Sequence, residues 1–135
     1  MRGDPGNPND WFRYAARDLE RARRLQPAQD PEGALFHLQQ AAEKALKGKL
    51  VEKGWKLQKT HDLAQLIEAA CRYGLDFEWF RSDAELLTLE YIADRYPGST
   101  EPIPCREEVE RLEISVTKLL RQLDVSLKPP EPEAS

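Results

Sequence analysis

A stripe of polar side chains in the segment 36–50 is the first place where this sequence could bind a ligand. Its members are three or four residues apart, so they share one side of the segment if it is helical. They are His37, Gln40, Lys44 and Lys47. Lysine side chains on such a stripe can attract phosphate groups or an acidic partner. The alternative is a solvated helix face, which has the same composition and no ligand.

The charge of the chain is polarised along the sequence. Residues 36–61 contain six Lys and two Glu, a balance of +4, although the whole chain carries −4. Residues 101–135 contain eight acidic and five basic residues, a balance of −3. The negative total gives no sign of nucleic-acid binding through bulk charge, so any attraction for phosphate is local and strongly screened by salt.

A second candidate stretch, Lys59-Thr60-His61-Asp62, precedes an apolar pattern of helical spacing. Thr60 is a suitable N-cap for that helix, and Asp62 in its first turn suits the helix dipole. Backbone N–H groups at a helix N-terminus bind anions, which would place Thr60 and His61 beside a phosphate. The alternative is a capping segment with no further role.

A third candidate stretch is YIADRYPG, residues 91–98, at the predicted end of a helix. Arg95 complements the helix dipole there and could also project into a groove as a phosphate ligand. Tyr91 and Tyr96 offer rings for stacking. The alternative is a charge at a helix C-terminus accompanied by two core tyrosines.

Signatures of the common enzyme classes are missing from the chain. There is no Gly-rich phosphate loop and no GxSxG nucleophile elbow. His37 and His61 could act as acid and base, but no feature of the sequence brings them together. Two Cys and two His, far apart, do not supply the four ligands of a structural zinc site. We therefore predict no catalytic residues, no metal and no cofactor, with Cys71 and Cys105 as free thiols.

The elements that position these residues are predicted to be helices. Apolar residues recur at helical spacing in five segments: about 9–25, 31–53, 60–73, 82–96 and 104–124. Asp30-Pro31 marks one start, and Ser82 with Glu85 forms a capping-box pattern at another. The aromatic stretch 75–81 fits either a core edge or an interface. Short connections favour antiparallel neighbours, so we expect an all-α, up-and-down bundle of four to five helices.

The length of 135 residues predicts one domain with its own core. We expect a flexible leader at residues 1–8, a helical domain at 9–124 and a disordered tail at 125–135, which contains three prolines. No apolar run is long enough to span a membrane, and the N-terminus has no signal-peptide pattern. A cytoplasmic location is therefore expected.

Three segments together resemble the HEPN domain family. They are FHLQQAAEKALKGKL at 36–50, THDL at 60–63 and YIADRYP at 91–97. The first helix, with Asp10-Trp11 and Asp18-Leu19, is also similar to that family. The resemblance covers roughly residues 9–124 and implies a bundle of four or five helices that pairs into a homodimer.

Many HEPN members are ribonucleases, often toxins of toxin–antitoxin pairs, and their signature is Arg, four to six residues, then His. Arg95 matches the arginine of this motif. The positions where His is expected hold Thr100, Glu101 and Pro102. No Arg stands four to six residues before His37 or His61. The acid–base group that RNA cleavage needs is absent from its expected place, which argues against ribonuclease activity.

The chain is similar to short HEPN members that accompany minimal nucleotidyltransferases. This resemblance implies a pocket for a nucleotide or RNA phosphate, made of Lys44, Lys47, His61, Arg95 and Tyr96. Our leading hypothesis is a homodimeric interaction module, one component of a toxin–antitoxin-like pair with a nucleotidyltransferase-like partner. The alternative is a metal-independent ribonuclease that uses Arg95 with a displaced His61 or with Tyr96. A third hypothesis is a structural dimer with no small ligand.

Overall fold

A computed structural model describes residues 2–26, 29–100 and 102–127 of the chain. Every regular element in these ranges is helical, which confirms the predicted all-α class. The elements are α1 (Pro8–Leu25), α2 (Pro31–Glu52), α3 (Leu63–Arg72), the short 3₁₀ helix η1 (Glu78–Phe80), α4 (Arg81–Arg95) and α5 (Arg106–Gln122).

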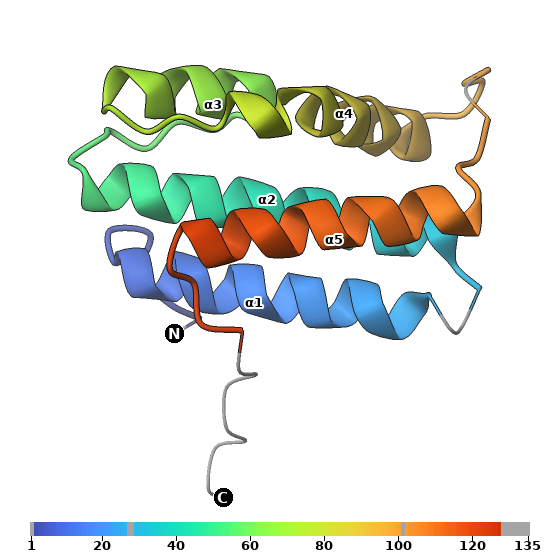
Figure 1. Ribbon diagram of the computed structural model, residues 1–135, viewed down its shortest axis with the longest axis horizontal. Coiled ribbons are helices and arrows are strands. Elements are labelled where there is room, and N and C mark those ends of the chain that lie inside the picture. Colours follow the sequence, from blue (N-terminus) through green and yellow to red (C-terminus); the bar gives the residue numbers. More distant parts are fainter. Residues whose placement is uncertain (1, 27–28, 101, 128–135) are drawn as a thin grey trace, which may run out of the picture.

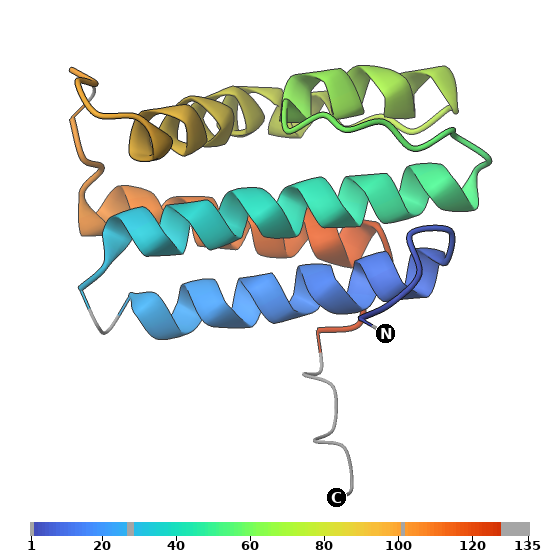
Figure 2. The same ribbon diagram turned by 180° about the vertical axis from the view of Figure 1, so that it is seen from behind.

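The longest helix, α2, is the centre of the bundle. It packs against all four other α-helices, and most extensively against α1. Figure 1 shows α1, α2 and α5 side by side, with α3 and α4 following one another along a further row. Seen from behind, α2 lies in front of α5, between α1 and the α3–α4 row (Figure 2). Side chains on α2 therefore meet groups from every part of the bundle.

Small residues let α1 and α2 approach closely. Ala15 of α1 and Ala41 and Ala45 of α2 have no exposed surface. A Cβ added at Gly48 would lie 2.8 Å from both Cε1 of Phe12 and Cβ of Trp11, closer than van der Waals contact allows. The close approach brings α1 side chains within bonding reach of α2.

Of the three helix starts predicted from capping patterns, one is confirmed and two are wrong. Asp30 caps α2 as predicted, accepting a bond from the Gly33 N–H at 2.9 Å. The prediction of Thr60 as the cap of α3 is wrong, because Asp62 takes that role and accepts from the Ala64 N–H at 3.0 Å. Thr60 instead accepts the N–H of Asp62 itself, at 3.1 Å.

The capping box predicted at the start of α4 is also wrong. The helix begins at Arg81 with no side-chain cap, directly after η1. Phe77 and Phe80 are buried in the core, and the Phe80 N–H bonds the Phe77 carbonyl at 2.9 Å. Burial of these two rings thus drives the chain into a 3₁₀ turn that leads into α4. Trp79, between them, stays 38% exposed.

Both ends of the described chain lie against the bundle. The Trp11 indole N–H donates to the Pro5 carbonyl at 2.8 Å, and the Asp4 N–H donates to Asp10 at 2.8 Å. At the other end, Val125 was assigned to the tail but is only 5% exposed and packs on the core. Residues 128–135 of the predicted tail lie outside the described residues. None of the described helices is long and apolar enough to cross a membrane.

Candidate functional site

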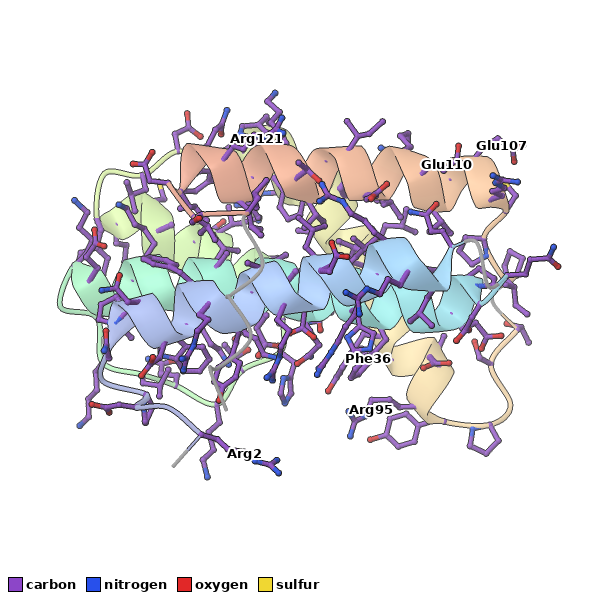
Figure 3. The ribbon with its side chains drawn as sticks, turned by 90° about the horizontal axis from the view of Figure 1, so that it is seen from below. Arg2, Phe36, Arg95, Glu107, Glu110 and Arg121 are labelled. Atoms are coloured by element: carbon purple, nitrogen blue, oxygen red, sulfur yellow. The ribbon has the colours of Figure 1, made fainter. Side chains whose placement is uncertain are left out.

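The polar stripe of α2 lies on the side of the bundle away from α5. Figure 3 shows Phe36 and Arg95 at one edge of the molecule, whereas the labelled α5 residues line the opposite edge. We call this side the polar face. Its ionisable side chains, from α1, α2 and the segment before α3, are Asp18, His37, Glu43, Lys44, Lys47 and His61.

Asp18 of α1 holds two members of the stripe. Its carboxylate lies 2.8 Å from Nδ1 of His37 and 2.5 Å from Nζ of Lys44. The Asp18 side chain is 4% exposed, so this charge is stabilised by its partners rather than by water. Asp18 was not among the site residues predicted from the sequence. The signal was present, since position 18 continues the apolar stripe of α1, where an acid is out of place.

Glu43 holds Lys47, the last member of the stripe, together with His61 from the segment before α3. Its carboxylate lies 3.0 Å from Nζ of Lys47 and 2.9 Å from Nδ1 of His61. It also accepts a bond from the Gln39 amide at 3.2 Å. The side chains of Glu43 and Lys47 are 5% and 6% exposed, and the Lys47 ammonium lies 5.9 Å from the Trp11 ring centroid. Glu43 and Lys47 are thus a buried ion pair.

The two lysines expected to hold phosphate are therefore engaged within the protein. Lys44 neutralises Asp18, and Lys47 neutralises Glu43. A phosphate that took either ammonium group would leave a buried carboxylate without its counter-charge, which costs several kcal/mol by order of magnitude.

The structure brings both histidines to the same face and orients them alike. Each uses Nδ1 to meet a carboxylate, His37 with Asp18 and His61 with Glu43. A carboxylate on one ring nitrogen fixes the orientation of an imidazole and sets which nitrogen carries the proton. It leaves Nε2 of each ring as the atom available to a ligand. His61 is the more accessible, with 57% of its side chain exposed against 22% for His37.

A row of aromatic rings connects the two histidines. Phe36 lies edge-on to His37 with centroids 5.2 Å apart, and it stacks on Tyr91 of α4 at 5.9 Å. Tyr91 in turn lies 5.4 Å from the His61 ring. The row His37–Phe36–Tyr91–His61 thus spans α2, α4 and the segment before α3. No sequence pattern predicted this juxtaposition.

Arg95 joins the same row at Tyr91. Its Nη1 donates to the Tyr91 hydroxyl at 2.6 Å, and its guanidinium carbon lies 5.0 Å from the ring centroid. Arg95 and His61 are therefore held against one tyrosine, and both are exposed. A guanidinium has five donors, so one bond to a hydroxyl leaves others for an anion.

Tyr96 lines a hollow that it shares with Arg95 and with none of the other predicted site residues. It is 66% exposed, and Glu32 and Asp94 also line this hollow of about 440 Å³. A hydrogen bond to the Asp94 carboxyl raises the pKa of Glu32 above its ordinary value. Because the carboxyl groups of Glu32 and Asp94 lie within hydrogen-bond distance of one another, the hollow is unfavourable for phosphate.

Comparison with known proteins gives two matches. A family model described as HEPN domain matches residues 8–126. The crystal structure of an archaeal HEPN homologue is similar at 26% sequence identity and a TM-score of 0.69, covering 90% of this chain and 98% of that chain. No curated protein matches the chain.

Proposed function

Since the chain belongs to the HEPN domain family, we propose that it is an interaction module that binds a nucleotide or RNA through its phosphate groups on the polar face. The observation that carries this proposal is the placement of Arg95 and His61 against Tyr91, at 5.0 and 5.4 Å from its ring centroid. Arginine recognises phosphate through parallel charge-assisted bonds, and the Nε2 of His61 supplies a second contact.

The other polar residues support this pair of ligand contacts. Glu43 anchors His61, and Lys47 keeps Glu43 neutralised in the buried interior. Asp18, Lys44 and His37 repeat the arrangement at the other end of the aromatic row. We assign phosphate contact to Arg95 and His61, and positioning to Lys44 and Lys47.

Replacing Arg95 with Ala is expected to weaken binding of a fluorescently labelled single-stranded RNA by about 10- to 100-fold. The estimate follows from the roughly 1.5–3 kcal/mol of hydrogen bonds to charged groups. Anisotropy titrations at fixed, low salt measure it. Arg72→Ala is the matched control, because Arg72 is an exposed arginine in the last turn of α3. Equal affinities for the two variants would contradict the assignment.

We further propose that the module is homodimeric and pairs with a nucleotidyltransferase-like protein in a toxin–antitoxin-like system. The family resemblance of the sequence supports this part of the proposal. Leu89 and Ile92 on α4 are 43% and 51% exposed, and they offer apolar surface to a protein partner. Co-purification of the chain with such a partner tests the pairing.

Metal-independent RNA cleavage is the second candidate function. The two histidines favour it, since each is oriented by a carboxylate at one end of a single row of rings. In such a reaction one imidazole accepts the proton of the ribose 2′-hydroxyl, whose oxygen attacks phosphorus. A second group protonates the departing 5′-oxygen, and Arg95 balances the charge that develops on the phosphate. We rank cleavage below binding because the family's Arg-to-His spacing is broken here.

A further inference from the structure

A row of three arginines lies along α1 beside the polar face. Its members are Arg13, Arg17 and Arg21, which follow one another at intervals of four residues and therefore share one side of the helix. All three are exposed. We call them the arginine row. Residues 11–24 hold five arginines against two acidic residues, a balance of +3 in a chain that carries −4.

The charge of the arginine row is only partly balanced by acids in the described part of the chain. Arg13 pairs with Asp10 at 3.1 Å, whereas Arg17 and Arg21 form no ion pair within the residues that the structure describes. Like charges four residues apart on a helix repel one another and destabilise it. The row is therefore unfavourable for the isolated helix, and its charge is available to an anionic ligand.

Tyr14 connects the arginine row to the polar face. The guanidinium carbon of Arg17 lies 4.5 Å from the Tyr14 ring centroid, and the ammonium of Lys44 lies 5.9 Å from the same centroid. The Tyr14 hydroxyl donates to the Arg2 carbonyl. Figure 3 shows Arg2 at the same edge of the molecule as Arg95. Basic side chains thus continue along this edge from the polar face onto α1.

The arginine row and Arg95 are too far apart for one phosphate group to contact both. Lys44, at the end nearest the row, lies eight residues after Phe36 on α2, a rise of about 12 Å along the helix. Phe36 stacks on Tyr91, which in turn holds Arg95. The two basic ends are therefore separated by a stretch of surface that contains the half-buried ring of Phe36.

We propose that the ligand of the polar face is a single-stranded RNA several nucleotides long, which continues from Arg95 past Phe36 to a second phosphate site at Arg17 and Arg21. This inference rests on the proposed function and specifies its ligand. Basic groups that follow a backbone, with aromatic rings between them for the bases, are typical of proteins that bind single strands. A guanidinium recognises a phosphate through parallel charge-assisted bonds.

An RNA strand fits these residues better than a mononucleotide or an acidic protein. A mononucleotide would occupy one basic end and leave the other without an anion. An acidic peptide would match the charges but would leave the ring of Phe36 without a base to stack on it. The carboxylates beside the path do not oppose a phosphate backbone, because Asp18 is neutralised by Lys44 and Asp10 by Arg13.

Anisotropy titrations of a labelled oligouridylate test the second phosphate site with the double variant Arg17→Gln, Arg21→Gln. We expect binding at low salt to weaken by about 10- to 100-fold. The slope of log affinity against log salt concentration should fall in magnitude by about 1.4, because each phosphate contact with a single strand contributes about 0.7. The double variant should be as stable as the wild type, since it removes like charges from one helix side.

The double variant Arg106→Gln, Arg121→Gln is the matched control. It removes the same charge from two exposed arginines of α5, and Figure 3 shows Arg121 at the edge opposite Arg95. Its affinity and salt slope should equal those of the wild type. Equal losses in the α1 and α5 variants, or no loss in either, would overturn the second site.

Ligand length separates this inference from the proposed function. The wild type should bind oligouridylates more tightly as they lengthen within the range of about 4–16 nucleotides, and the α1 variant should still bind uridine monophosphate as the wild type does. If length has no effect but Arg95→Ala still weakens binding, the inference falls and the proposed ligand site stands. If Arg95→Ala has no effect either, both fall. A wild type that binds polyglutamate as tightly as oligouridylate would assign the arginine row to an acidic protein and also overturn the inference.

Discussion

Glu43→Gln is expected to lower the free energy of unfolding by about 3–5 kcal/mol. The amide keeps the size of the side chain but removes the charge opposite Lys47, whose side chain is 6% exposed and cannot turn to water without opening the contact with α1. His61 contributes little to this loss, because it is 57% exposed and can be solvated in place. Chemical denaturation with linear extrapolation measures the change.

Two further variants make this expectation specific. Glu52→Gln is the matched control on the same helix, since Glu52 forms an i,i+3 pair with Lys49 at 2.9 Å and is 44% exposed. It should cost less than about 1 kcal/mol. The double variant Glu43→Leu with Lys47→Met removes both charges and should regain most of the stability. A cost for Glu43→Gln no larger than that for Glu52→Gln would show that Lys47 is not buried.

Asp18→Asn is the second large effect that we expect, at about 2–3 kcal/mol. Its carboxylate serves Lys44 and His37, whose side chains are 23% and 22% exposed and so retain partial access to water. The penalty for leaving Lys44 unpaired is therefore smaller than for Lys47. The same denaturation experiment checks the order of the two losses.

Glu20→Gln is the control for Asp18→Asn on α1. Glu20 pairs with Arg24 at 3.2 Å, and the two side chains are 36% and 75% exposed. Little change is expected there. If Asp18→Asn costs more than Glu43→Gln, the exposure of Lys44 and Lys47 does not govern these energies, and the division of the polar face into two carboxylate-centred halves needs revision.

The helices were predictable because each carries its own apolar spacing, and that signal is local. Asp30-Pro31 predicted the start of α2 for the same reason. Thr60 failed as a cap since Asp62, two residues later, offers a stronger acceptor. The predicted start of α4 was wrong because burial of Phe80 is a tertiary effect that overrides a local capping pattern.

The site was predictable only in part, because its chemistry depends on which helices face one another. Arg95 and His61 were selected from the sequence, and the structure holds both against Tyr91. Asp18 and Glu43 were not predicted as site residues, although between them they pair with every other ionisable side chain of the polar face. The helical spacing also placed Lys47 on one polar stripe with more exposed side chains. Spacing within one helix takes no account of Trp11, which lies on the neighbouring helix.

Incubating the purified chain with labelled single-stranded RNA, in the presence of a metal chelator, tests the central claim most directly. The wild type is compared with Arg95→Ala and His61→Ala on gels that report bound and cleaved RNA together. We predict that the wild type binds RNA and leaves it intact, and that both variants bind it more weakly. Cleavage by the wild type that either substitution abolishes would contradict the binding-module account and establish a ribonuclease built on His61 and Arg95.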